Sequence, residues 1–160
     1  MKSVFTKLMA TSIIALLFTG AAEARTCFLW QIDDVAFGNY FPMQAGPLDA
    51  RGRIRVLCWG RATDGQGNSY TVRISGIVAP GPYGRRMNSG TDQLEYNLYK
   101  DAARTDVWGD GSFGATPLVN VFGNNRFVVV GNHSVYGRVP PLLDPASGVY
   151  NDIVDVTIEF

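Results

Sequence analysis

Residues 154–160, which read Val-Asp-Val-Thr-Ile-Glu-Phe, alternate strictly between apolar and polar side chains. A period of two is typical of a β-strand, because successive side chains of a strand point to opposite faces. The apolar face of this segment carries Val154, Val156, Ile158 and Phe160. Chain ends are usually frayed and polar. We therefore expect this apolar row either to lie inside a sheet or to border a groove that receives another strand.

The same alternation recurs in the interior of the chain. It occurs over residues 53–58, 70–75 and 94–99, each with one apolar and one mainly polar face. Residues 127–130 are instead a continuous apolar run, which predicts a strand covered on both faces. Clusters of Gly, Pro, Asn and Asp separate these segments, and residues 25–160 contain no sustained 3.6-residue apolar period. The pattern predicts an all-β fold, an antiparallel β-sandwich.

Residues 1–24 have the layout of a secretory signal peptide. Two lysines precede an apolar run over residues 8–18, and small residues lie before a cleavage point at Arg25. The apolar run is shorter than the roughly 20 residues that a membrane-spanning helix needs, so we expect cleavage rather than an uncleaved anchor. The mature chain, residues 25–160, is then one secreted domain that does not insert into a membrane.

The charges of the chain nearly cancel. It contains 14 Lys and Arg residues and 14 Asp and Glu residues, and without residues 1–24 the formal net charge is −1. A balance of this kind provides no strong field of one sign. We therefore expect no nucleic-acid partner.

Both cysteines, Cys27 and Cys58, belong to the predicted mature chain. An exported chain meets an oxidising compartment, and two cysteines allow only one intramolecular pairing. The alternative is two buried free thiols, which export makes the weaker interpretation. The sequence thus predicts a disulfide that closes a loop of about 30 residues.

Side chains that could support catalysis or metal binding are few. His133 is the one histidine of the chain and lies beside Gly131-Asn132, where we expect a solvated loop residue. Asp110, between two glycines, is expected to serve turn geometry rather than calcium binding. The sequence contains no nucleophile elbow, zinc-protease motif, phosphate-binding loop or dinucleotide fingerprint. We therefore predict no enzyme activity, no catalytic residues, no metal site and no cofactor.

Aromatic side chains are plentiful, at 12% of the chain. Exposed aromatic rings could bind sugar, and Trp59 and Trp108 are the candidates for such a site. Aromatic residues more often fill a small β core. A self-contained secreted carbohydrate-binding module, or a spore-coat-like surface protein, therefore stays the alternative function.

Several short motifs occur in an order that resembles the spore coat protein U domain family, which includes subunits of archaic chaperone–usher pili of the Csu type. The motifs follow Cys27 and lie at residues 35–40, 52–58, 86–87, 94–99, 108–111, 135–138 and 146–152. The resemblance covers essentially the whole predicted mature chain. It implies an immunoglobulin-like β-sandwich that lacks one strand and leaves an apolar groove.

The resemblance also implies the partners and the location of the protein. A periplasmic chaperone lends a strand to the groove, and at the outer-membrane usher a segment of another pilus subunit replaces that strand, by β-augmentation. The protein would then be a structural or adhesive subunit at the cell surface. Val154, Val156, Ile158 and Phe160 are the residues expected to border the groove.

The N-terminal region departs from the family pattern. Subunits that polymerise carry a donor segment before the first cysteine, whereas only Arg25 and Thr26 lie between the predicted cleavage point and Cys27. At roughly 3.3 Å per residue such an arm could not span a groove. The sequence therefore favours a terminal or tip-located subunit over a repeating shaft subunit.

Overall fold

The computed structural model describes residues 25–60, 68–123 and 127–160 of the chain. Within these residues it contains no α-helix, one short 3₁₀ turn over residues 112–114 and eight β-strands. The strands are β1 (Thr26–Asp33), β2 (Leu48–Trp59), β3 (Ser69–Ile74), β4 (Arg85–Ser89), β5 (Asp92–Tyr99), β6 (Leu118–Val121), β7 (Val128–Val139) and β8 (Val156–Glu159). The predicted signal peptide, residues 1–24, lies outside the described residues.

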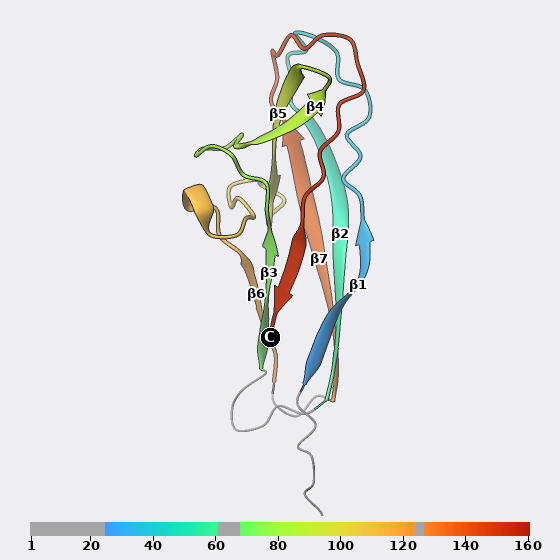
Figure 1. The fold of residues 1–160 in the computed structure, drawn as a ribbon, viewed down its shortest axis with the longest axis vertical. Coiled ribbons are helices and arrows are strands. Elements are labelled where there is room, and N and C mark those ends of the chain that lie inside the picture. Colours follow the sequence, from blue (N-terminus) through green and yellow to red (C-terminus); the bar gives the residue numbers. More distant parts are fainter. Residues whose placement is uncertain (1–24, 61–67, 124–126) are drawn as a thin grey trace, which may run out of the picture.

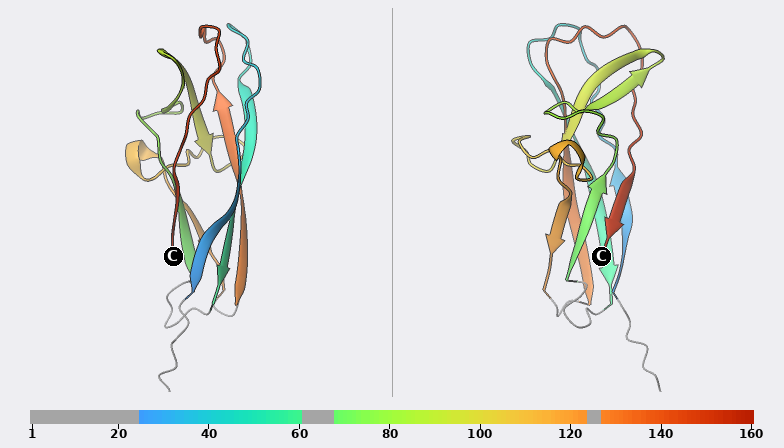
Figure 2. Two further views of the ribbon diagram at one scale, coloured as in Figure 1. Left: turned by 45° about the vertical axis from the view of Figure 1, so that its right-hand side comes forward. Right: turned by 60° about the vertical axis from the view of Figure 1, so that its left-hand side comes forward.

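The strands form two antiparallel sheets that pack face to face (Figures 1 and 2). The larger sheet has the order β1-β2-β7-β5-β4, and the smaller has the order β6-β3-β8. The long pair β2 and β7 runs in continuous register from Leu48 opposite Val139 to Trp59 opposite Val128. The predicted all-β antiparallel sandwich is confirmed.

Alternate residues of the strands build the core between the sheets. On β2 the inward side chains Ile54, Val56 and Cys58 are buried, while the residues between them are partly exposed. The same alternation buries Tyr70, Val72 and Ile74 of β3. The period of two in the sequence thus reports the inward face of β2 and β3, because a pleated strand points successive side chains to opposite sides. The prediction of one apolar and one mainly polar face for residues 94–99 does not hold on β5, because Asn97 and Tyr99 are buried as well as Tyr96 and Leu98.

The prediction for residues 127–130 is wrong. Val129 is buried, but Phe127, Val128 and Val130 are each about half exposed, at 53%, 51% and 49%. The start of β7 therefore has one covered face and one open face. The apolar side chains on its outer face are open to solvent because no third layer of the described chain covers the larger sheet.

The prediction for His133 is also wrong. The residue lies within β7, opposite Ile54 of β2, and not in a solvated loop. Its imidazole is partly buried, and its Nε2 atom lies 2.6 Å from the hydroxyl oxygen of Tyr70 on the other sheet. Burial lowers the pKa of His133 and raises the pKa of Tyr70 to about 12. The histidine is thus a neutral polar link between the two sheets.

His133 makes stability depend on pH. Its folded-state pKa lies below the ordinary value of 6.5, so the unfolded chain binds the proton first as the pH falls. The free energy of unfolding should therefore decrease as the pH falls below about 6.5. Urea denaturation at pH values on either side of that point measures the effect. His133→Gln, which keeps a hydrogen-bonding side chain but does not titrate in this range, should remove it, and an unchanged pH dependence in this variant would contradict the assignment.

None of the helical residues in the described ranges forms a segment long and apolar enough to cross a membrane.

Candidate functional site

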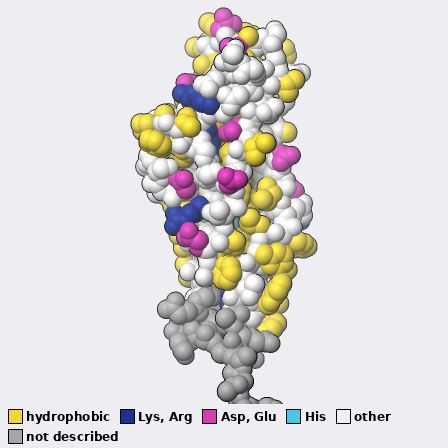
Figure 3. Space-filling view, viewed as in Figure 1, with side chains coloured by type: hydrophobic (Ala, Val, Ile, Leu, Met, Phe, Trp, Pro, Cys, Tyr) yellow, Lys and Arg dark blue, Asp and Glu magenta, His cyan; other side chains and the backbone are white. Residues whose placement is uncertain are grey.

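One side of the sandwich is bordered by two strands that are paired on one side only. β1 is the edge strand of the larger sheet and pairs with β2, while β8 is the edge strand of the smaller sheet and pairs with β3. The two edges approach each other without joining into one sheet. Figure 1 shows β8 between β3 and β1, and Figure 3 shows hydrophobic side chains gathered along the β1 side of this face.

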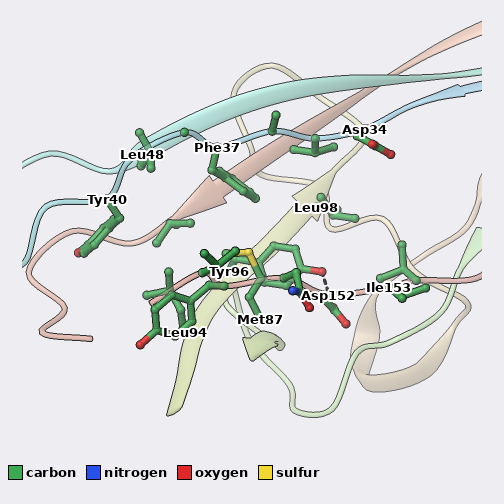
Figure 4. Close-up of a pocket in the computed structure, with 18 of the residues that line it drawn as sticks. Asp34, Phe37, Tyr40, Leu48, Met87, Leu94, Tyr96, Leu98, Asp152 and Ile153 are labelled. Atoms are coloured by element: carbon green, nitrogen blue, oxygen red, sulfur yellow. Dashed lines mark hydrogen bonds between the residues drawn. The ribbon is translucent and has the colours of Figure 1, made fainter. Parts of the chain in front are cut away.

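A groove of about 1040 Å³ opens along this side of the molecule. Its floor is formed by side chains of the hydrophobic core, namely Leu48, Ile54, Ile74, Met87, Leu94, Tyr96, Leu98, Val135 and Val139. Figure 4 shows several of these side chains together with the chain segments that flank them. Apart from Leu48, these floor side chains are at most 7% exposed, so on this side the core is covered by irregular segments and not by a paired strand.

Two irregular segments form the walls of the groove. Residues 32–42, which are the end of β1 and the segment after it, form one wall, and residues 145–156, which lead into β8 and include its first residue, form the other. Large apolar side chains at the walls are open to solvent: Ile32 is 49% exposed, Phe41 68% and Ile153 92%. A concave apolar site with apolar walls of this kind is suited to burying apolar side chains of a partner.

The four residues predicted to border a groove occupy different places. Val154 and Val156 line the groove directly. Ile158 packs against the core further along β8 and is not among the lining residues. Phe160 follows the end of β8 and is 57% exposed. The alternation itself holds, because Val154, Val156 and Ile158 are partly buried while Asp155, Thr157 and Glu159 are exposed.

The first wall is joined to the loop after β7 near Tyr40. The hydroxyl of Tyr40 donates a hydrogen bond to the carbonyl of Pro140 at 3.0 Å and accepts one from the backbone N–H of Leu143 at 2.9 Å. Backbone bonds from Met43 to Leu143 and from Leu142 to Gln44 continue this contact. These bonds tie the first wall to the loop that follows β7.

A buried arginine, Arg85, lies beneath the second wall. It is 0% exposed, and its guanidinium donates to the carbonyls of Ser75, Ile74 and Trp108, the last two at 3.2 and 3.1 Å. Burial is the main reason that its pKa is lowered, although Tyr96 and Asp152 act in the opposite direction. Arg85 therefore connects β4 to β3 and to the segment around Trp108.

Tyr96 links the floor of the groove to its second wall. Its hydroxyl donates to the carboxylate of Asp152 at 2.5 Å, a bond that is drawn in Figure 4. Burial first, and the neighbouring Asp152 second, raise the pKa of Tyr96, so this hydroxyl keeps its proton at physiological pH. Further bonds hold the same wall: Asn151 forms a backbone bridge with Asn88, and Tyr150 donates to Asp92 at 3.0 Å.

Neither wall was placed at the groove from sequence periodicity. Val35 and Phe37 do alternate with exposed neighbours, but the segment is too short and too rich in Gly and Pro to be identified as a strand. Residues 145–153 show no period of two. Their positions result from tertiary hydrogen bonds such as Tyr96 to Asp152, which leave no local signature in the sequence.

The remaining candidate residues lie away from the groove. Cys27 and Cys58 face each other across β1 and β2 and are joined by a disulfide, which secures the edge strand beside the groove.

Trp108 is 0% exposed, and its Nε1 donates to the carbonyl of Val72 at 3.0 Å, so it cannot stack on a sugar, whereas Trp59 is 45% exposed. Asp110 accepts a hydrogen bond from the backbone N–H of Ser112 at 2.9 Å within a turn. In the described ranges, no group of three His, Cys, Asp or Glu side chains converges as metal ligands do.

Comparison with known proteins agrees with this architecture. The sequence pattern of the Spore Coat Protein U domain family matches residues 13–157. Protein U of Myxococcus xanthus is 34% identical over 134 residues, which cover 78% of this chain and 70% of that protein. The family is one of structural domains and is not known for enzymatic activity. The disulfide and the family match indicate an extracytoplasmic surface protein. With a match that extends over most of its length and a relative at this level of identity, the chain belongs to the Spore Coat Protein U domain family.

Proposed function

We propose that this protein is a subunit of a chaperone–usher surface fibre, and that it accepts a donor strand in the groove between β1 and β8. A periplasmic chaperone supplies the strand first, and a neighbouring subunit supplies it after assembly at the outer-membrane usher. The predicted signal peptide directs the chain to the periplasm, and the fibre displays it at the cell surface. The groove acts by binding and needs no catalytic residue.

The observation that carries this proposal is a groove along one side of the sandwich, which has the hydrophobic core as its floor and lies between two strand edges that are unpaired among the described residues. The open edge of β8 offers backbone N–H and C=O groups to an added strand. The groove beside it offers apolar side chains to every second residue of that strand. Exposed apolar side chains along its walls, such as Phe41 and Ile153, are an aggregation hazard in a secreted protein unless a partner covers them.

The proposed position in the fibre rests on the predicted cleavage point and its closeness to β1. This strand begins at Thr26, next to the predicted cleavage point at Arg25, and it already pairs with β2. A terminal position, in which the subunit accepts a strand without donating one, is therefore proposed over a repeated position in the shaft.

Co-expression of the full chain with its cognate periplasmic chaperone tests the proposal. The expected result is a stable one-to-one complex with the chaperone, and a much lower yield of soluble chain when the chaperone is absent. A chain that accumulates as a stable monomer in both cases, with no complex formed, would contradict the proposal.

Three substitutions separate strand capture from folding. Ile153→Asp changes a groove residue that is 92% exposed, so it should leave the thermal unfolding of the isolated domain unchanged. It should nevertheless weaken chaperone co-purification about tenfold or more, because it places a charge in an apolar interface. Val156→Asp, which is partly buried, should reduce both folding and capture. Asp155→Asn, on the exposed face between them, should change neither. Equal capture by all three variants would show that the groove is not the binding site.

A further inference from the structure

The outer face of the larger sheet carries a row of arginines. Arg51, Arg53 and Arg55 occupy alternate positions of β2, while Gly52 and Ile54 between them are buried against the core. All three guanidinium side chains therefore lie on one face, at intervals of about 6.6–6.8 Å along the strand. This face is the outside of the sandwich and is separate from the groove.

The positive charge of this arginine row is not cancelled by ion pairs. The structure has salt bridges at Arg73, Arg86, Lys100, Arg104 and Arg138, but none between Arg51, Arg53 or Arg55 and a carboxylate of the described residues. The carboxylate across from Arg53, on Asp33, accepts a 2.5 Å hydrogen bond from Gln31 instead. The chain has a net charge near zero, but three of its positive charges are grouped on this face, which the composition alone did not predict.

Uncharged side chains of β1 and β7 contact Arg51 and Arg55. On β7 the residues opposite Arg55, Arg53 and Arg51 are Asn132, Ser134 and Tyr136. Arg51 donates to the hydroxyl of Ser134 and lies 5.3 Å from the centre of the Tyr136 ring. Arg55 donates to the side-chain oxygen of Gln31 at 2.9 Å, while its Nε is buried with no acceptor among the described residues. These contacts order the guanidinium groups of Arg51 and Arg55. Arg51 is exposed and Arg53 partly exposed, so their side chains can reach a ligand on this face.

The row ends on an aromatic surface. Beyond Arg55 the outward positions of β2 are Leu57 and Trp59, and Trp59 is 45% exposed. Its ring packs edge-on against Phe28 of β1, with ring centroids 5.0 Å apart. A fixed, partly open indole at the end of a charged row presents a flat apolar surface in line with the guanidinium groups.

We infer that this face binds a linear acidic polysaccharide, with its carboxylate or sulfate groups on Arg51, Arg53 and Arg55. Arginine is suited to this task because its planar fork of N–H donors matches an oxyanion. The side chains of Ser134 and Asn132 lie beside Arg53 and Arg55 on the neighbouring strand β7, where they can bond to sugar hydroxyls. An extended polymer, laid along the strand, matches a straight row of charges better than a membrane surface does, since the row lies on the long side of the molecule and not at a protruding end.

Binding of the full chain, with its chaperone if that is needed for solubility, to immobilised polygalacturonate and to heparin tests the inference. We expect the protein to be retained on both acidic polymers and not on neutral pullulan. Retention should be lost as salt is added, because the electrostatic screening length falls from about 10 Å at 0.1 M salt to about 3 Å at 1 M. The triple variant Arg51→Gln, Arg53→Gln, Arg55→Gln should bind at least about tenfold more weakly.

A control variant of equal net charge separates this face from general electrostatics. Arg73→Gln, Arg86→Gln, Lys100→Gln also removes three positive charges, but from side chains paired with carboxylates elsewhere on the molecule. It should keep the affinity of the wild type. Equal losses in the two variants, absence of wild-type binding, or binding to vesicles of phosphatidylcholine and phosphatidylglycerol but not to the polysaccharides would each overturn the inference.

Discussion

Replacement of Arg85 by methionine is expected to destabilise the folded domain by on the order of 3 kcal/mol or more. The side chain is 0% exposed and donates to three backbone carbonyls, those of Ile74, Ser75 and Trp108. Methionine fills a similar volume but has no donor, so these carbonyls would lose their partner in a site that water does not reach. The measurement is the shift of the urea midpoint at constant m-value.

The neighbouring arginine is a matched control for this prediction. Arg86 has a 25% exposed side chain and forms a salt bridge of 2.9 Å with Glu95. Surface pairs of this kind contribute about 0–1 kcal/mol, so Arg86→Met should shift the midpoint little. If the two substitutions cost the same, the buried donors of Arg85 do not stabilise the fold. Because Arg85 lies beneath the groove wall that contains Asp152, its loss should also lower chaperone capture.

Removal of the disulfide by the double change Cys27→Ala, Cys58→Ala is expected to destabilise the domain by roughly 3–4 kcal/mol. The bond closes a loop of 31 residues, and the unfolded chain gains entropy when that loop opens. Both sulfurs lie in the core, where Cys27 is 5% and Cys58 0% exposed, so the packing around them also weakens. β1 is an edge strand, and loss of its link to β2 should loosen the wall of the groove.

Reduction of the wild-type protein provides the control for the disulfide. Unfolding of the wild type in reductant should approach that of the double variant, and reductant should have no effect on the variant itself. Mass spectrometry of the exported wild type should show a mass two hydrogens lower than that of the reduced form. A variant as stable as the oxidised wild type would show that the bond contributes nothing to folding.

The strands with a regular period of two could be predicted from the sequence, and the less regular parts could not. Residues 54–58, 70–74 and 154–158 each place their apolar residues on the inward side, as their alternation indicates. The run at residues 127–130 was misinterpreted, because hydrophobicity does not reveal whether a second layer covers a strand. His133 was misplaced for a related reason: its partner, Tyr70, is 63 residues away and contributes nothing to the local pattern.

The candidate groove, too, could be predicted only in part from the sequence. The C-terminal row from Val154 to Phe160 was predicted from its alternation alone, yet the walls of the groove depend on contacts between distant segments. Tyr40 meets Pro140 and Leu143, which are about 100 residues away in sequence. No local property of these residues indicates that they contact one another beside the groove.

The sequence by itself determined the properties that depend on composition and local period. These are the all-β fold, the inward faces of the regular strands and the pairing of the two cysteines, because pleat geometry and the number of thiols allow few alternatives. The tertiary structure alone decided which edges stay open, which arginine is buried and which arginines form a row. The reason is physical: strand order, desolvation and charge clustering arise from contacts between residues far apart in the chain, and a linear pattern does not contain them.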